Sequence, residues 1–305
     1  MSSPGPDGRI AFVTTDIPIA LDDPDRSLYT AALTAVGVEP AHHHWWDPTV
    51  AWSAFDLVVV RTPWDYPQRL PEMLAFLDRV EGLGTVRNPV GVIRWNLDKR
   101  YLADLADRGV PTVPTTYVTD EDRIGAALTG ADADEVVVKP TVSAGSADTG
   151  LFATDDPAAA DLARTILDAG KTVMVQPAVA SVAERGETAV LAFDGRVSHA
   201  AGKGPLLALG GGLRGGSYLE AIAARGATAD EVAVAERTLD AVASLGTERG
   251  WSAPEEPLLY ARIDVVTLDD GSAAVLEAEL FEPSLFLPTD PDAAHRFAAA
   301  CLARL

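Results

Sequence analysis

The sequence predicts an α/β protein with a parallel α/β N-terminal domain followed by two smaller α+β subdomains. Strand-like and helix-like segments alternate over residues 10–107, which is typical of a parallel, doubly wound sheet. From residue 112 the pattern changes to shorter strands, and two pairs of them, 135–139 with 151–153 and 189–193 with 197–200, are expected to form hairpins. We expect an N-terminal domain at 1–110, a small lid subdomain at 111–188 and a C-terminal subdomain at 189–305.

The N-terminal domain is predicted from apolar runs and amphipathic periodicity. Strands are expected at residues 10–15 and 55–61, and helices at 26–36, 69–80 and 97–107. Gly37 and Gly109 follow two of these helices, where glycine commonly ends a helix. Asn96 precedes the third helix, and we expect its side chain to cap it.

The two following subdomains are predicted from shorter strands and their turns. In the lid, strands are expected at 112–118, 135–139, 151–153 and 172–176, and helices at 124–128 and 157–169. In the C-terminal subdomain, strands are expected at 189–193, 197–200, 259–267 and 274–280, and a helix at 229–245. The pair Asp194 and Gly195 predicts a tight hairpin turn, and Thr228 with Glu231 fits a capping box. Residues 202–216 are glycine-rich and predict a mobile loop.

The composition limits the partners. The 305 residues carry 24 Lys and Arg against 45 Asp and Glu, a net charge of −21, which disfavours nucleic acid because a phosphate backbone needs a basic surface. We find neither a signal peptide at residues 1–9 nor an apolar run near the ~20 residues that span a bilayer. Cys301 is the only cysteine, which fits a reducing cytoplasm. We expect a cytoplasmic protein without a membrane partner, and a homo-oligomer is compatible with the sequence.

A phosphate site is predicted where an apolar strand ends at Lys139. A lysine offers a compact cation on a flexible stem, and the small residues Ser143, Gly145 and Ser146 let the following backbone approach a phosphate closely. The spacing is not that of a Walker P-loop, and the alternative is an ordinary flexible hairpin. Lys99, on the first turns of a helix, would by itself be explained as a solvated surface lysine.

A magnesium site is predicted from two strands near the C-terminus. Arg262 and Asp264 alternate on one strand and Glu277 and Glu279 on the next, so each pair faces one side of its strand. The three carboxylates could then meet at one point, and Mg²⁺ prefers carboxylate and phosphate oxygens. Arg262 would stabilise a phosphoryl group during its transfer. The alternative is an acidic exposed face with a salt bridge, although both strands are otherwise apolar and buried like charges need a cation.

Two further regions are candidates for ligand contacts. The segment that follows the strand at 172–176 could lie along a purine edge through Gln176, Pro177 and Val179, with Glu184 or Glu187 near the ribose. Ligands bind at the carboxyl ends of strands in open α/β sheets. A substrate pocket is therefore expected from the residues that leave the first two strands, with plain turns as the alternative: Thr15, Asp16, Arg61, Trp64, Asp65 and Tyr66.

The aromatic and histidine residues near position 45 favour structural roles. His42, His43 and His44 are consecutive, so in a strand they cannot all face one metal ion. Trp45, Trp46 and Trp52 are expected to pack between domains.

Taken together, these residues resemble the ATP-grasp ligase superfamily, in the branch with glutathione synthetase and the ribosomal-protein glutamate ligases. The resemblance runs from about residue 10 to the C-terminus, and its most specific parts are residues 96–99, 137–140, 176–177, 262–264 and 276–279. Two features depart from the family pattern. Many members have asparagine at the position of Glu279, and the loop that holds Lys203 and Arg214 is richer in glycine here.

The resemblance implies an ATP-grasp architecture in which the two α+β subdomains clasp ATP. Lys99 and Lys139 would hold the phosphates, and the segment after Gln176 would lie along adenine and ribose. The residues matching Asp264, Glu277 and Glu279 would hold one or two Mg²⁺ ions. The negative charge on the phosphoryl group during its transfer would be stabilised by Arg262, Lys203 and Arg214. In the family, ATP phosphorylates a small-molecule carboxylate, and an amine then attacks the acylphosphate to form an amide-type bond.

Among the small single-chain members, the layout is similar to the cycloserine synthetases, which close O-ureido-D-serine into a five-membered ring. The resemblance therefore implies an ATP- and Mg²⁺-dependent cyclo-ligase of antibiotic biosynthesis. One alternative is an intermolecular ligase that joins an amino acid to an amine or peptide. A second alternative is an inactive nucleotide-binding module, against which the presence of all three acids and both lysines argues.

Overall fold

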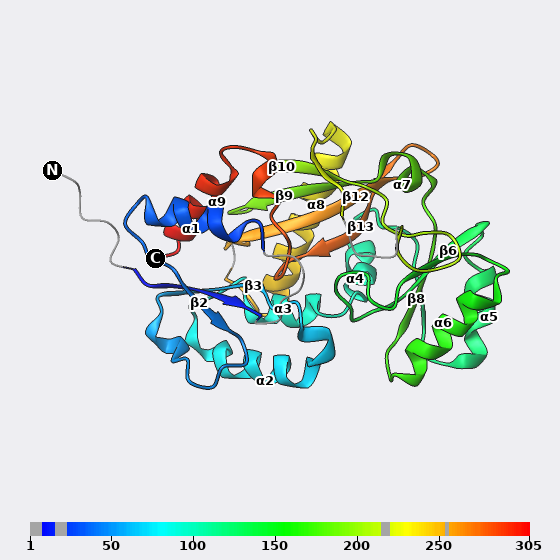
Figure 1. Ribbon diagram of the computed structural model, residues 1–305, viewed down its shortest axis with the longest axis horizontal. Coiled ribbons are helices and arrows are strands. Elements are labelled where there is room, and N and C mark those ends of the chain that lie inside the picture. The colour runs from blue at the N-terminus through cyan, green and yellow to red at the C-terminus, as the bar shows by residue number, and fades with distance from the viewer. Residues whose placement is uncertain (1–7, 16–22, 215–219, 254–255) are drawn as a thin grey trace.

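The computed structural model describes residues 8–15, 23–214, 220–253 and 256–305, and its strands form three β-sheets with helices on their faces (Figure 1). The three sheets follow one another along the chain, first a parallel sheet and then two antiparallel ones. The predicted α/β class is confirmed. The domain boundaries stay a prediction, but residues 187 and 188 already belong to the first strand of the C-terminal sheet.

The N-terminal sheet is parallel with strand order β2-β1-β3-β4. Its strands are β1 (Ile10–Thr14), β2 (Ala41–His44), β3 (Leu57–Thr62) and β4 (Val86–Arg87). Its helices are α1 (Arg26–Thr34) and α2 (Leu70–Val80), with 3₁₀ turns at Trp52–Ala54, Tyr66–Gln68 and Glu81–Leu83. The strands at 10–15 and 55–61 and the helices at 26–36 and 69–80 are confirmed to within a few residues.

The middle sheet is antiparallel with order β5-β8-β6-β7. Its elements are β5 (Thr116–Val118), α5 (Ile124–Thr129), β6 (Glu135–Pro140), β7 (Gly150–Ala153), α6 (Pro157–Asp168), β8 (Val173–Pro177) and the 3₁₀ turn Glu121–Arg123. A core of its own lies between the strands and the two helices. The predicted pairing of residues 151–153 with the strand that carries Lys139 is confirmed.

The C-terminal sheet has the order β11-β10-β9-β12-β13. Its strands are β9 (Glu187–Phe193), β10 (Arg196–Lys203), β11 (Ile222–Ala224), β12 (Tyr260–Thr267) and β13 (Ala273–Glu279). Asp194 and Gly195 both adopt positive φ in the β9–β10 turn, as the sequence predicts. The helix α8 (Ala229–Glu248) starts with the predicted capping box. Further helices are α7 (Ala180–Arg185) and α9 (Ala293–Leu302), with a 3₁₀ turn at Leu287–Thr289.

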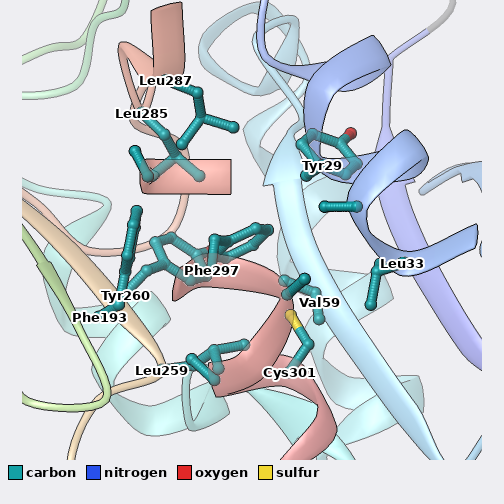
Figure 2. Packing of buried hydrophobic residues seen from close by; sticks show 14 of the residues in the cluster. Tyr29, Leu33, Val59, Phe193, Leu259, Tyr260, Leu285, Leu287, Phe297 and Cys301 are labelled. Atoms are coloured by element: carbon teal, nitrogen blue, oxygen red, sulfur yellow. The ribbon is translucent and has the colours of Figure 1, made fainter. Parts of the chain in front are cut away.

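Both faces of this sheet are buried. Side chains alternate along each strand, so neighbouring residues of one strand pack into different cores. On β9, Val190 and Ala192 face α8, whereas Ala189, Leu191 and Phe193 face the cluster that holds α9. Figure 2 shows that second cluster, in which Phe297 and Cys301 of α9 pack among side chains from α1, β3 and the C-terminal sheet. The C-terminal helix thereby joins the N-terminal domain to the C-terminal sheet.

The predicted helix at 97–107 is confirmed as α4 (Tyr101–Asp107), but its start and its Asn96 cap are wrong. A separate helix, α3 (Val90–Asn96), precedes it, and Asn96 is the last residue of α3. Its buried amide instead donates to the Ala278 carbonyl and accepts from the Leu280 N–H, both at 2.8 Å. Asn96 therefore provides hydrogen-bond partners for backbone groups at the free edge of β13. No local sequence pattern reveals this contact.

The expected packing of tryptophans between domains is also wrong. Trp45 and Trp52 are buried in the core of the N-terminal domain, and Trp46 packs against that core. The histidines form the edge strand β2 and alternate as predicted: His42 stacks on Phe12, and His43 lies against Trp52 on the other side. Among the described residues, no helix is both long and apolar enough to cross a membrane.

We predict that Asn96→Ala destabilises the protein by about 2–6 kcal/mol, because it leaves two buried backbone groups at the end of β13 without partners at roughly 1–3 kcal/mol each. Urea unfolding followed by circular dichroism would measure the loss. Thr129→Ala, which removes an exposed hydroxyl, serves as the control. A loss for Asn96→Ala as small as that for the control would show that the edge of β13 does not need this amide.

Candidate active site

A cavity of about 1560 Å³ lies between the middle sheet and the C-terminal sheet. Strands β6, β7 and β8 line one side, and residues of β9, β10, β12 and β13 line the other. Trp64, from the loop after β3, also lines the cavity. The volume exceeds the roughly 300–1,000 Å³ of a typical small-molecule site, so the cavity has room for two ligands.

The middle sheet presents Lys139, which lies at the end of β6 as predicted and is 8% exposed. Among the described residues its ammonium has no hydrogen-bond or ion-pair partner. Burial lowers its pKa; Glu277 opposes this change, and the cations of Lys99 and Lys203 add to it. A buried cation without a partner, facing a cavity, favours an anionic ligand.

Lys99 lies beside this end of the cavity and is not a surface lysine. Its ammonium donates to the Ser143 carbonyl at 2.8 Å and lies 3.1 Å from Glu277. The loop between β6 and β7 lines the cavity with Ser143, Gly145 and Ser146, and the last two have positive φ. The structure therefore brings both lysines and the small-residue loop together, as the sequence predicts.

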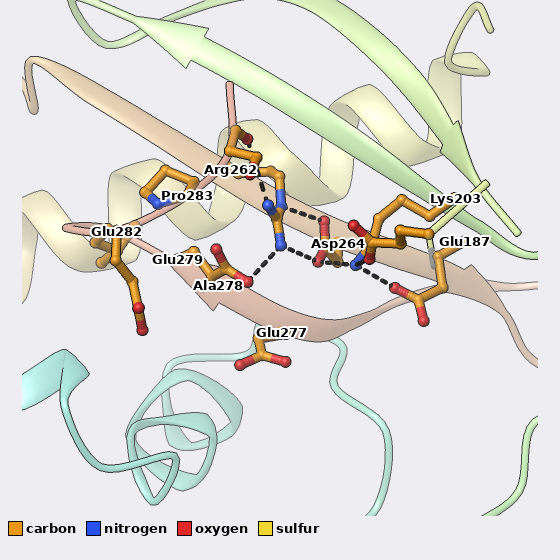
Figure 3. Close-up of polar contacts among 12 residues, drawn as sticks. Glu187, Lys203, Arg262, Asp264, Glu277, Ala278, Glu279, Glu282 and Pro283 are labelled. Atoms are coloured by element: carbon orange, nitrogen blue, oxygen red, sulfur yellow. Dashed lines mark hydrogen bonds and ion pairs between the residues drawn. The ribbon is translucent and has the colours of Figure 1, made fainter. Parts of the chain in front are cut away.

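The C-terminal sheet presents a network of buried ion pairs (Figure 3). In the register of β12 and β13, Arg262 lies opposite Glu279 and Asp264 opposite Glu277. Arg262 donates to both oxygens of Asp264, at 2.9 and 3.0 Å, and also to Glu279. Lys203 of β10 donates to Asp264 at 2.7 Å and to Glu187 at 2.9 Å. These predicted residues are thus neighbours in space.

The three acids differ in how they face the cavity. Glu277 and Glu279 line it, whereas Asp264 is 1% exposed and lies behind the cations of Arg262 and Lys203. In the described part of the chain, no group of three or more potential ligand side chains has a metal-binding arrangement. The expected meeting of three carboxylates at one point is therefore not formed, because Asp264 is engaged by its two basic neighbours.

The charges of Glu277 and Glu279 are nevertheless suited to a cation. Burial opposes the charged form of Glu277, but Lys99 and Lys139 outweigh it and lower the pKa. Burial raises the pKa of Glu279 to about 7, helped by Glu277 and Asp264 and only partly opposed by Arg262. A divalent cation between Glu277 and Glu279 would relieve this repulsion, and carboxylate oxygens are hard ligands of the kind that Mg²⁺ prefers.

Gln176, Pro177 and Val179 line the cavity beyond Lys139, as expected. The Gln176 amide donates to Thr115 at 2.9 Å, and its carbonyl oxygen is buried without a partner among the described residues. Glu187 also lines the cavity, but it pairs with Lys203. Glu184 lies on the exposed face of α7 outside the cavity, so its predicted ribose contact is wrong.

Of the predicted substrate pocket, Trp64 lines the cavity and donates its indole N–H to the Glu282 carbonyl at 2.9 Å. Arg61 is wholly buried between the rings of Tyr29 and Tyr260, so its expected contact with a substrate is wrong. The guanidinium is held there by the Pro283 carbonyl and by the carboxylate of Asp25.

Three other residues of the predicted pocket, Thr15, Asp65 and Tyr66, lie outside the cavity lining. Asp65 accepts a hydrogen bond from the Trp45 indole at 2.7 Å within the core, which corrects its predicted role. Tyr66 is buried against Phe281, behind the cavity wall. Thr15 follows β1 and is not part of the lining, and Asp16 lies outside the described residues.

Arg214 lines the cavity from the glycine-rich loop and donates to the Leu207 carbonyl at 2.8 Å. The same loop reaches the middle sheet, where the N–H groups of Gly210 and Gly211 both donate to the Leu151 carbonyl at 3.0 Å. Gly211 has φ +91 and packs so closely on Phe152 that a Cβ atom would lie 2.9 Å from the ring. The loop therefore bridges the two sides of the cavity.

Sequence reasoning missed Glu282, whose side chain is 8% exposed and lines the cavity. A signal was present, since Glu282 is a third carboxylate in the same apolar segment as Glu277 and Glu279. Phe286 also lines the cavity, with the Arg262 guanidinium 5.1 Å above its ring and an unusual positive φ of 48.

The same fold is found in known proteins. The ATP-grasp ligase PsnB, in a structure with its minimal precursor, Mg and ADP, superimposes with a TM-score of 0.61 at 18% identity and covers 97% of each chain. The fold is therefore that of the ATP-grasp ligases, as the sequence predicts.

Closer relatives define the family. Residues 10–88 match the family model described as the N-terminal domain of D-cycloserine synthetase DcsG. The cycloserine biosynthesis protein DcsG of Streptomyces lavendulae is 41% identical over 306 residues, which cover 98% of this chain and 99% of that protein. The crystal structure of D-cycloserine synthetase DcsG superimposes with a TM-score of 0.87 at 38% identity, over 97% of this chain and 99% of that one. The chain belongs to the DcsG family of D-cycloserine synthetases and is an ATP-dependent ligase.

We predict that the metal-free protein becomes less stable as the pH rises from about 4.5 to about 7. Glu279 keeps its proton in the folded state up to a pKa of about 7, whereas the unfolded chain releases it near the ordinary value of 4.5. The folded state therefore holds more protons in this window, and its stability falls with rising pH. Thermal midpoints across this range in the presence of a chelator would show a shallower fall for Glu279→Gln. Glu236→Gln, which changes an exposed residue of α8, should show the same dependence of the thermal midpoint on pH as the wild type. An unchanged dependence for Glu279→Gln would contradict the prediction.

Proposed function

We propose that this ligase uses ATP and Mg²⁺ to activate the carboxylate of O-ureido-D-serine as an acylphosphate and closes the molecule into D-cycloserine. The observation that carries the proposal is one cavity with the unpaired Lys139 on one wall and Glu277 and Glu279 on the other. It is supported by the 41% identity to a cycloserine biosynthesis protein over almost the whole chain.

The nucleotide would lie along the middle sheet. Lys139, Lys99 and the loop that holds Ser143 and Ser146 offer positive charge and backbone groups to the triphosphate. Gln176 and the segment after it border the part of the cavity that would take adenine. ATP supplies the phosphoryl group and Mg²⁺ the charge neutralisation that phosphoryl transfer needs.

Glu277 and Glu279 would hold Mg²⁺, because both line the cavity and lie on one face of β13. Asp264 would join them as a third ligand by exchanging its contact with Lys203 for the metal. This exchange would also release the Lys203 ammonium toward the transferring phosphoryl group.

Three basic residues of the cavity would stabilise the negative charge that develops during phosphoryl transfer. When the carboxylate oxygen attacks the terminal phosphorus of ATP, negative charge spreads over the phosphoryl oxygens, and Arg262, Lys203 and Arg214 offer donors toward that part of the cavity. The substrate nitrogen then attacks the acyl carbon, and inorganic phosphate leaves. Since the attacking nitrogen belongs to the same molecule, ring closure needs no second substrate. The contact of Gly210 and Gly211 with Leu151 covers the cavity, which would keep water from the acylphosphate.

We predict that Lys139→Ala lowers kcat/KM for ATP by roughly 10- to 150-fold, because a charge-assisted contact to phosphate is worth roughly 1.5–3 kcal/mol and Lys139 has no other partner to replace. ADP release in a coupled assay would measure the change. Arg164→Ala, which removes an exposed cation on α6, is the charge-matched control. Near-normal turnover of a folded Lys139→Ala protein would refute the phosphate assignment.

We predict that O-ureido-D-serine alone, with ATP and Mg²⁺, yields ADP and a cyclic product that contains one amino-acid unit. Mass spectrometry of the products would test this, and addition of free amines or amino acids should leave the product mass unchanged. A product that appears only with an added amine, and contains it, would show intermolecular ligation. No ADP release across a broad panel of carboxylates would show that the cavity binds the nucleotide without this chemistry.

A further inference from the structure

Glu282 is a buried carboxylate in the cavity that the steps above do not use. It follows the end of β13, is 8% exposed and lines the same cavity as Glu277 and Glu279. Figure 3 shows its side chain apart from the ion pairs of Arg262 and Lys203. Among the described residues, no lysine, arginine or histidine forms an ion pair with it.

The backbone around Glu282 is held firmly in place. The Trp64 indole donates to its carbonyl at 2.9 Å, and Arg61 donates to the Pro283 carbonyl at 2.5 Å. Two residues further on, the carboxylate of Asp25 accepts hydrogen bonds from the N–H groups of Leu285 and Leu287 at 2.6 and 2.8 Å. The segment is thus fixed through its main chain, and the Glu282 side chain is left available to the cavity.

Charge at this end of the cavity is unbalanced. Burial raises the pKa of Glu282 well above its ordinary value, and the charge of Glu279 adds to this effect. The positive charge of Lys99 and a hydrogen bond from Tyr66 lower this pKa, but they offset only part of the rise. A carboxylate in such a place is stabilised by a cation that arrives with the ligand.

We propose that Glu282 binds the ammonium group of the amino-acid substrate and so makes the site specific for α-amino carboxylates. This proposal rests on the proposed amino-acid ligase function. The ammonium and carboxylate of an α-amino acid are separated by one carbon, so anchoring the ammonium at Glu282 fixes the carboxylate nearby for phosphorylation. The Trp64 ring, which borders the same wall, supplies an aromatic surface of the kind that also stabilises an ammonium ion.

The test compares two ligands with two proteins. Binding of O-ureido-D-serine and of its deaminated counterpart, 3-(ureidooxy)propanoate, is measured by calorimetry in the presence of Mg-ADP, with wild type and Glu282→Gln. We expect Glu282→Gln to weaken binding of the amino acid about 10- to 100-fold, as loss of a charged hydrogen bond does. Binding of the deaminated ligand should change less than about twofold. Binding of ADP itself should also stay within about twofold of wild type.

A matched control and a second readout separate this role from others. Glu236→Gln removes an exposed carboxylate on α8 and should leave both ligands unaffected. The Mg²⁺ concentration needed for half-maximal ADP binding should be the same in wild type and Glu282→Gln, whereas a metal ligand would change it. Equal losses for both ligands, no loss for either, a changed Mg²⁺ requirement, or no binding of the amino acid to wild type would each overturn the proposal.

The proposed function is tested separately, by ADP release and product mass. A wild-type protein that binds the amino acid through Glu282 but forms no cyclic product would contradict the function and leave the ammonium site standing. Normal cyclisation by Glu282→Gln with unchanged binding would contradict the ammonium site and leave the function standing.

Discussion

The carboxylate of Asp264 is the interaction on which the rest of the site depends. It is almost wholly buried and is shared by Arg262 of its own strand and Lys203 of β10. Burial opposes its charge, but the two cations outweigh burial and hold its pKa below the ordinary value. Ala189, which lies opposite Asp264 on the intervening strand β9, leaves room for the Lys203 side chain to cross. Removing Asp264 would leave two buried cations without this partner, which is far more damaging than losing a surface ion pair.

The edge strand of the same sheet, β13, must also be held in position because it carries Glu277 and Glu279. Glu277 and Glu279 lie on β13, the outermost strand, whose free backbone groups would otherwise be satisfied by water. The side chains of Asn96 and Tyr101 provide those hydrogen bonds from α3 and α4. The position of the two acids that line the cavity therefore depends on residues from the N-terminal third of the chain.

The sequence predicts those parts of the site that rest on local periodicity. Lys139 at the end of a strand and the same-face pairs of β12 and β13 follow from alternation over two residues. What alternation cannot show is which partner each side chain meets. Asp264 contacts two cations, and one of them, Lys203, lies on a strand 61 residues earlier in the sequence, so local alternation could not reveal the contact. Arg61 leaves a parallel strand as a ligand-binding residue would, yet residues about 222 positions away fold over it and bury it.

The missed helices and residues have the same cause. Asn96 has a cap-like sequence context, but its partners lie on β13, more than 180 positions away. Glu282 had a local signal, a third acid among apolar residues, and only the cavity shows that it is accessible to a ligand. The expected fold class required no such distant contacts, because the order of strand and helix segments along the chain already indicates an α/β protein.

The packing of α3 and α4 on the C-terminal sheet has a consequence for how the molecule can be divided. One core joins α8 and the strands β9, β12 and β13 to Val92, Tyr101, Leu102 and Leu105 of α3 and α4. Most buried residues of the middle sheet pack with its own helices in a second core. A fragment beginning at β9 would expose the apolar surface that these helices cover, so it is not an autonomous folding unit. The middle sheet is also anchored to the first core, because Met174 of β8 is buried in that core and Tyr117 of β5 packs against it.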